Sequence, residues 1–137
     1  MGTSSKMRIL ERKVTIAVLW LLQVANYVAY ILISLFETEP FGAAIEGGSG
    51  PTLAVFFFVP CLMAWLTLVS LRISRWPNVV LGSLFASLKL AAALGLVAEV
   101  SAAAVFNELW AFLAAALVVF YAWKKPSDAD VNTRVGP

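Results

Sequence analysis

The sequence contains no histidine and a single cysteine, Cys61. A lone cysteine cannot close a disulfide within the chain, and the lack of histidine removes both the commonest metal ligand and the commonest general base near neutral pH. The apolar runs also lack paired carboxylates at one depth, which acid–base chemistry would use. We therefore expect a protein that is not an enzyme and that has neither a metal site nor a cofactor.

Charge is also scarce in this chain. Charged residues make up 13% of the 137 residues, whereas soluble proteins carry about 25%. Because most of these charges fall outside the apolar runs, and no basic stripe with interleaved aromatic residues occurs in a polar segment, we expect no nucleic-acid partner. Apolar residues account for 61% of the chain, above the range of about 45–50% in soluble proteins. The composition therefore indicates an integral membrane protein.

Four apolar runs are each long enough to cross the hydrocarbon core of a bilayer, which takes about 20 helical residues. They follow a basic N-terminal segment, residues 1–13, and precede a polar C-terminal tail, residues 126–137. The membrane domain between these two segments covers residues 14–125. We predict an all-α membrane protein, an antiparallel bundle of four transmembrane helices at residues 14–36, 52–71, 78–98 and 103–123.

Basic residues outside the runs lie on one side of the predicted bundle. They precede the first run, connect the second run to the third and follow the fourth, whereas the other two connections are acidic and carry Glu37, Glu39, Glu46 and Glu99. The positive-inside rule therefore places both termini in the cytoplasm of a multi-pass protein of the plasma (inner) membrane. The candidates for contacts with lipid headgroups are Arg72, Arg75, Lys124 and Lys125. Arg75 and Asn78 can instead cap and anchor the third run, which we favour.

The third run contains a lysine, Lys89, well inside its apolar sequence. A charge at that depth costs about 2.5–3.5 kcal/mol on insertion scales, so the side chain should face protein or water. Alignment of the runs by helical rise places Lys89 level with Asn26 and Pro60, and places Glu108 nearer the outer surface, within reach of the lysine stem. We predict a Lys89–Glu108 ion pair. The candidate intramembrane polar site comprises Lys89, Glu108, Asn26, Tyr27, Gln23 and Asn107.

Each of these polar residues also has a purely structural interpretation. Lys89 can snorkel to the surface or pair at a subunit interface, and Glu108 can reach the headgroups. Asn26 and Gln23 are more often hydrogen-bonding groups that hold membrane helices together than ligand-binding groups.

Two further patterns predict how the helices pack. Pro60 lies inside the second run, where a proline usually kinks a helix. Residues 72–77 read as a tight turn that ends with Pro77 at the start of the third helix. Small residues spaced by four along the third run predict a helix-packing stripe on the side opposite Lys89, formed by Ser83, Ser87, Ala91 and Gly95.

Short motifs give the chain a resemblance to two groups of membrane proteins. Its length and four runs resemble the small multidrug transporters, but residues 14–36 lack the membrane-embedded glutamate on which those proteins depend. The chain is more similar to a family of four-span bacterial and archaeal integral membrane proteins of unknown function. The residues that carry this resemblance are Leu19, Trp20, Asn26, Tyr27, Pro60, Met63, Ser70, Leu71, Arg72, Arg75, Trp76, Asn78 and Gly82. The resemblance implies four spans and does not imply an activity.

Two functional hypotheses follow. The first is a non-catalytic accessory or assembly subunit of a membrane complex, in which the polar residues set the helix register. The alternative is a small homo-oligomeric transporter or ligand-binding membrane protein that uses the polar site around Lys89. Four helices leave little room for a solute pathway unless the protein oligomerises, which favours the first hypothesis. The expected partners are membrane lipids and either further copies of the chain or another membrane protein.

Overall fold

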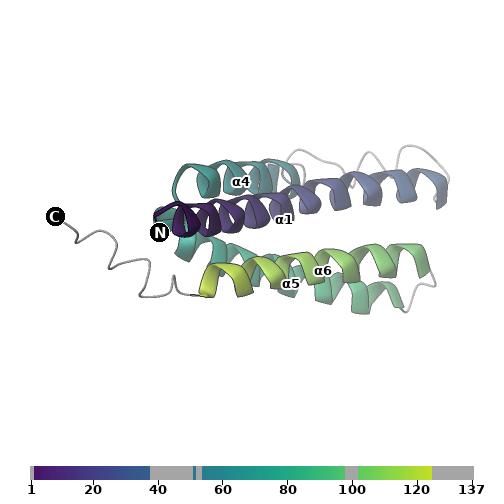
Figure 1. Ribbon diagram of the computed structural model, residues 1–137. Coiled ribbons are helices and arrows are strands. Elements are labelled where there is room, and N and C mark those ends of the chain that lie inside the picture. Colours follow the sequence, from purple (N-terminus) through teal and green to yellow (C-terminus); the bar gives the residue numbers. More distant parts are fainter. Residues whose placement is uncertain (1, 38–50, 52–53, 98–101, 125–137) are drawn as a thin grey trace.

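The computed structural model describes residues 2–37, 51, 54–97 and 102–124. These residues form the α-helices α1 (Gly2–Glu37), α4 (Val59–Val69), α5 (Leu71–Val97) and α6 (Ala102–Trp123), together with one π-helical stretch, η1 (Ala54–Phe58). The described part of the chain is therefore helical and contains no strand, as predicted. Figure 1 shows two layers of helices, one with α1 and α4 and the other with α5 and α6.

Three of the helices are long and apolar enough to cross a membrane, over Thr3–Ile33, Leu71–Gly95 and Ala102–Trp123. The fourth apolar segment, Ala54–Val69, is shorter. At about 1.5 Å per residue it extends about 24 Å, less than a hydrocarbon core of about 30 Å. It ends at Val69 because Ser70 has an extended backbone, with φ −151° and ψ 108°. The predicted second span, 52–71, is thus longer than the helix, and residues 52–53 lie outside the described part.

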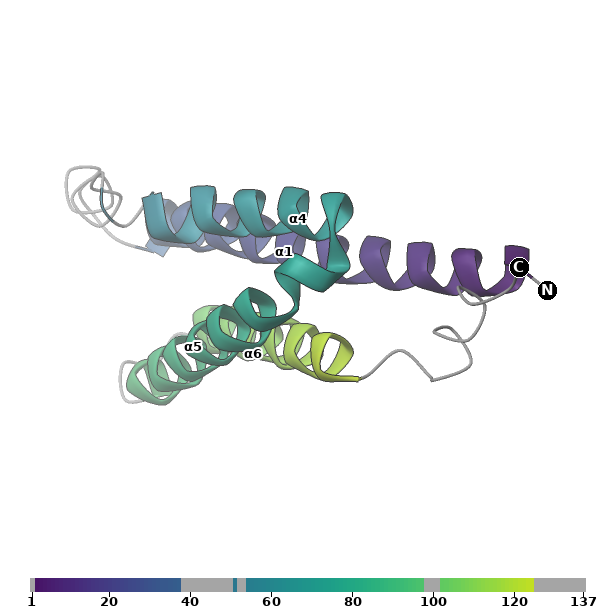
Figure 2. The same ribbon diagram turned by 90° about the vertical axis from the view of Figure 1, so that its left-hand side faces the viewer.

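The basic N-terminal segment belongs to the first helix. We predicted residues 1–13 as a polar segment ahead of the span, but α1 continues without a break from Gly2 to Glu37. Figure 2 shows the first turns of α1 projecting beyond the ends of α4 and α6. The side chains of Lys6, Met7 and Arg8 on these turns are exposed.

The chain turns between α4 and α5 at a single residue, Ser70. Its hydroxyl accepts a hydrogen bond from the Ile73 N–H over 3.5 Å, and its carbonyl accepts one from the Ser74 N–H over 3.0 Å. Ser70 therefore caps α5. This corrects two predictions, because residues 72–77 are helical with Pro77 inside α5, and because Asn78 lies in the helix interior rather than at its cap.

Pro60 is the second residue of α4, the helix that follows η1 directly, and its side chain is buried. Proline has no N–H to donate to the preceding turn, and its ring clashes with the carbonyl four residues earlier. A local π-helical turn is one arrangement that re-satisfies the backbone groups that a proline frees in a membrane helix. At Pro60, where we predicted a kink in the second span, the helix thus changes from π-helix to α-helix.

The packing between α5 and α6 depends on Gly82. A Cβ atom added to Gly82 would lie 2.9 Å from Val119 Cγ2 and 3.3 Å from Val118 Cγ1, so a larger residue would force these valine side chains or the helices to move. The structure corrects the predicted packing stripe within this chain. Its four residues are exposed, and a Cβ atom added to Gly95 would meet nothing within 4 Å. The members of this outward stripe are Ser83, Ser87, Ala91 and Gly95.

Hydrogen bonds between α1 and α6 show how these two helices are aligned. Arg12 donates to the Tyr121 carbonyl, Gln23 to the Ala111 carbonyl and Asn26 to the Asn107 carbonyl. The residue number of the partner on α6 falls as the residue number on α1 rises. Between these contacts lies the apolar core, in which the Trp20 ring meets the Phe85 ring edge-on, with 5.4 Å between centroids.

Candidate functional site

A buried polar layer crosses the bundle near the start of α6. It contains every residue of the predicted intramembrane site, and all of them except the half-buried Asn107 are buried. One turn of α1, one turn of α6 and a single residue of α5 supply these side chains. We call the following set the polar layer: Gln23, Asn26, Tyr27, Lys89, Asn107 and Glu108.

An ion pair between α5 and α6 forms the charged part of the polar layer. Lys89 Nζ lies 3.1 Å from Glu108 Oε2 and donates a long hydrogen bond, 3.5 Å, to Glu108 Oε1. The residues are only 6% and 3% exposed, respectively. The predicted Lys89–Glu108 pair is therefore present, and neither side chain extends to the surface. In apolar surroundings each charge offsets much of the cost of burying the other.

Amide side chains join α1 to α6 within the polar layer. Gln23 Nε2 donates to the Ala111 carbonyl over 2.8 Å, and Asn26 Nδ2 donates to the Asn107 carbonyl over 2.7 Å. Asn107 Nδ2 donates in return to the Asn26 carbonyl over 3.3 Å. A sliding movement of α1 along α6 would break all three bonds, so these amides set the register of the two helices.

Phe56 of η1 is a member of the site that the sequence did not reveal. Lys89 Nζ lies 4.9 Å from the centroid of the Phe56 ring, within the range of a cation–π interaction. The Tyr27 ring stacks on the Phe56 ring with 5.9 Å between centroids, and the Phe85 ring meets the Phe56 ring edge-on with 5.6 Å between centroids. We expected Pro60 at the level of Lys89, but Phe56 is the residue of that segment that reaches the lysine.

Several oxygen atoms of the polar layer are buried without a hydrogen bond to any residue that the structure describes. They are Gln23 Oε1, Asn26 Oδ1, the Tyr27 hydroxyl and Glu108 Oε2. Glu108 Oε2 is close to Lys89 Nζ, but the directions of the two groups do not suit a hydrogen bond. The polar layer thus has more hydrogen-bond acceptors than the described donors satisfy.

A second polar cluster, also missed by sequence reasoning, joins α1, α4 and α5. Trp20 Nε1 donates to Asn78 Oδ1 over 2.6 Å, and Asn78 Nδ2 donates to Thr67 Oγ1 over 3.0 Å. All three side chains are buried. Unlike the polar layer, this cluster contains no unpartnered side-chain atom in the described part of the chain. Its signal in the sequence is a tryptophan, a threonine and an asparagine within apolar runs, each with a polar group that needs a partner.

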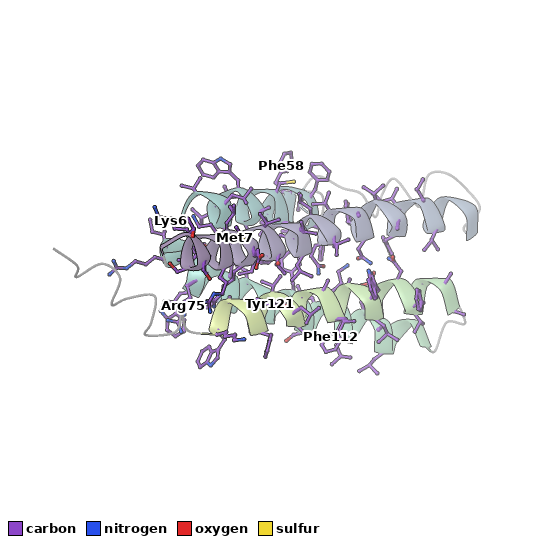
Figure 3. The ribbon with its side chains drawn as sticks, in the orientation of Figure 1. Lys6, Met7, Phe58, Arg75, Phe112 and Tyr121 are labelled. Carbon is purple, nitrogen blue, oxygen red and sulfur yellow. The ribbon has the colours of Figure 1, made fainter. Side chains whose placement is uncertain are left out.

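Basic side chains gather at the end of the bundle where α4 and α6 end and α5 begins, which we call the basic end. Arg12 donates to the carbonyls of Tyr121, Ala122 and Lys124, and Arg75 donates to the Trp123 carbonyl over 3.3 Å. Lys13 reaches the carbonyls of Leu68 and Val69 at the end of α4. These cations satisfy carbonyls that have no partner within their own helix. Figure 3 shows Lys6, Arg75 and Tyr121 toward this end.

The residues predicted to contact lipid headgroups differ in their exposure at the basic end. Arg72 and Lys124 are exposed at the basic end, whereas Arg75 is half-buried, caps α6 and lies with its Cζ 5.9 Å from the Trp76 ring centroid. Trp76 and Trp123 are exposed and meet edge-on, with 6.1 Å between centroids. Lys125 and the acidic residues Glu39, Glu46 and Glu99 lie outside the described residues.

The described part of the chain is helical, and three of its helices are long and apolar enough to cross a membrane. Within the described residues, no group of three or more His, Cys, Asp or Glu side chains is placed to hold a metal ion. Comparisons with protein-family models, with curated proteins and with solved structures gave no match to the chain.

Proposed function

We propose that the chain is a multi-pass protein of the plasma (inner) membrane, an antiparallel bundle with both termini in the cytoplasm. The three long apolar helices support the membrane location. The basic end, with Arg12, Lys13 and Arg75, suits the cytoplasmic side under the positive-inside rule. The segment Ala54–Val69 serves as the remaining span, and its short length is accommodated by local thinning of the bilayer.

We further propose that the protein is a non-catalytic accessory or assembly subunit of a membrane complex. One observation carries this proposal: the charged and amide groups of the polar layer bind other helices of the same chain. Lys89 pairs with Glu108, and the side-chain nitrogens of Gln23 and Asn26 bind backbone carbonyls of α6. Groups used in this way hold helices in register and make a rigid unit that presents its outer faces to other molecules.

The outer faces of the bundle are apolar and aromatic. Phe106, Trp65 and Trp110 expose 73%, 60% and 53% of their surface, and Figure 3 shows Phe58 pointing away from α4. In a bilayer such faces meet lipid tails or the helices of another membrane protein. An accessory subunit uses part of this surface to bind its partner.

A second candidate function is a small homo-oligomeric transporter or ligand-binding protein. The observation in its favour is a buried ion pair with unpartnered oxygen atoms beside it, because ionisable groups inside membrane spans often mark solute or ion pathways. A bundle this small gains room for a pathway only by association of several copies.

Purification in a mild detergent, followed by measurement of the mass of the particle, tests the two candidates. A defined membrane protein that co-purifies in fixed ratio supports the accessory role. A homo-oligomer without other proteins contradicts that role and supports the transporter.

Solute flux into liposomes then tests the transporter directly. A transporter loses flux when Lys89→Met is introduced and keeps it when Lys6→Met, a change at an exposed lysine, is introduced. Equal fluxes for the wild type, both variants and empty liposomes would contradict transport for the solutes tested.

A further inference from the structure

The amide oxygens of the polar layer are held in place by the bonds of their nitrogens. Gln23 Nε2 and Asn26 Nδ2 each donate to a backbone carbonyl on α6, over 2.8 Å and 2.7 Å. Rotation of either amide by half a turn would bring its oxygen against that carbonyl, where two acceptors would repel each other. The unpartnered atoms Gln23 Oε1 and Asn26 Oδ1 are therefore acceptors that need a donor.

The Glu108 carboxylate and the Tyr27 hydroxyl, in the same layer, also have room for further hydrogen bonds. Within the described residues, the hydrogen bond that the Glu108 carboxylate accepts is the 3.5 Å bond from Lys89 to Oε1, and Oε2 lies 3.1 Å from the same ammonium group without a hydrogen bond. The carboxylate therefore has acceptor capacity left. The Tyr27 hydroxyl, on a residue that is 4% exposed, has no described partner and can donate or accept. A buried polar group without a hydrogen-bond partner lowers the stability of the folded protein by about 1–3 kcal/mol. We therefore expect a molecule outside the chain to supply partners for these groups.

The unpartnered atoms lie at one level of the bundle. Gln23, Asn26 and Tyr27 occupy one turn of α1, and the α1–α6 hydrogen bonds align that turn with Asn107 and Ala111, on either side of Glu108. The Phe56 ring contacts both the Tyr27 ring and the Lys89 ammonium group, so Tyr27 and the ion pair pack around one aromatic side chain. These atoms therefore belong to one layer of the bundle rather than to separate parts of it.

Charge decides the chemical class of that molecule. A metal ion or an ammonium ligand would repel the Lys89 ammonium group, which already neutralises Glu108. An anion would be repelled by the unpartnered oxygen atoms, because hydrogen-bond acceptors carry partial negative charge. A small neutral molecule with two donors and two acceptors suits the group, and buried water typically makes about three hydrogen bonds to groups of this kind.

We propose that the polar layer is a water-binding site in the membrane-spanning part of the protein. Bound water donates to Gln23 Oε1, Asn26 Oδ1 and the Glu108 carboxylate, and exchanges hydrogen bonds with the Tyr27 hydroxyl. The site does not depend on the accessory or the transport role, because it follows from unpartnered atoms alone.

Solid-state NMR of the protein in lipid bilayers, with magnetisation transferred from water to side-chain amides, tests the proposal. Gln23 is the only glutamine in the chain, so its side-chain amide signal is identified without ambiguity. The Asn78 amide is an internal control, because it is equally buried but has a partner for both its oxygen, Trp20, and its nitrogen, Thr67. We expect transfer to Gln23 to be several-fold faster than transfer to Asn78. Equal, slow transfer to both amides would overturn the proposal.

The Tyr27→Phe variant supplies a second test, because a hydrated site and a dry site predict changes in the Tm of opposite sign. The substitution keeps the ring that stacks on Phe56 and removes only the hydroxyl. If the hydroxyl is dry and unpartnered, its removal raises the Tm, whereas loss of a hydrogen bond to water lowers it. We expect a lower Tm for Tyr27→Phe and an unchanged Tm for the exposed control Tyr30→Phe. An unchanged or raised Tm for Tyr27→Phe would contradict the proposal.

Discussion

Lys89 Nζ lies 3.1 Å from Glu108 Oε2 in the interior of the helix bundle, and the two residues come from the consecutive helices α5 and α6. Each is buried almost completely. The pair therefore couples the burial of one charge to that of the other. Loss of one partner leaves an isolated charge in apolar surroundings, which is more damaging than loss of both.

Stability measurements on Lys89→Met test this coupling. Because Glu108 would remain buried without its partner, we expect a loss of about 3–5 kcal/mol in the free energy of unfolding. The double variant Lys89→Met/Glu108→Gln should recover most of that loss. Titration from mild detergent into SDS, followed by circular dichroism, measures both effects. Lys6→Met is the control at an exposed lysine. A Lys89→Met variant as stable as the wild type would contradict the coupling.

The Gly82→Leu variant probes the contact between α5 and α6. A side chain at Gly82 would press against Val118 and Val119, so we expect this variant to lose about 1–3 kcal/mol or more of stability, as overpacked cores do. The matched control is Gly95→Leu in the same helix, where a Cβ atom meets nothing within 4 Å. The same SDS titration compares the two variants. Equal losses would show that Gly82 is not the close-contact residue.

Asn78→Leu tests the second polar cluster. The substitution leaves the Trp20 indole N–H without its acceptor and removes one partner of the Thr67 hydroxyl, which keeps its hydrogen bond to the Met63 carbonyl. We expect a loss of about 1–3 kcal/mol. Ser83→Leu, on the exposed side of the same helix, should change stability little. Thermal unfolding of both variants provides the comparison. If Asn78→Leu were no less stable than Ser83→Leu, the cluster would not contribute to stability.

Arg12 is expected to protect the last turn of α6. Its guanidinium group donates to several carbonyls there, which a single ammonium group cannot match. We predict that Arg12→Met speeds hydrogen–deuterium exchange across residues 119–123 and costs about 0.3–2 kcal/mol, and that Arg12→Lys restores only part of the protection. Arg8→Met, at an exposed position of α1, should leave exchange unchanged. Unchanged exchange in Arg12→Met would show that α6 needs no such cap.

The outcome for the candidate site illustrates what helical periodicity can predict. Because an α-helix rises by a constant amount per residue, alignment of the apolar runs is enough to place Lys89, Glu108 and Asn26 in one region of the bundle. The same reasoning failed for Phe56. Its position depends on the π-helical stretch η1, and apolar sequence alone does not distinguish a π-turn from an α-turn.

Helix faces were harder to assign than helix levels. The regular spacing of Ser83, Ser87, Ala91 and Gly95 identifies one side of a helix but does not identify what that side meets. In the structure the close contact is made by Gly82, on another side, because the valines of α6 lie there. Asn78 was likewise interpreted as a cap, since the sequence does not show that Trp20 and Thr67 approach it.

Amino-acid order alone was enough for the helical class, the membrane-compatible length of three helices and the proximity of Lys89 to Glu108. These properties depend on composition, run length and helical rise, which are local. Tertiary structure alone revealed that Ser70 is the break between α4 and α5, that Gly82 is the close contact and that Arg12 caps α6. These properties depend on which residues distant in sequence meet, and that is set by how the helices rotate and tilt when their side chains pack.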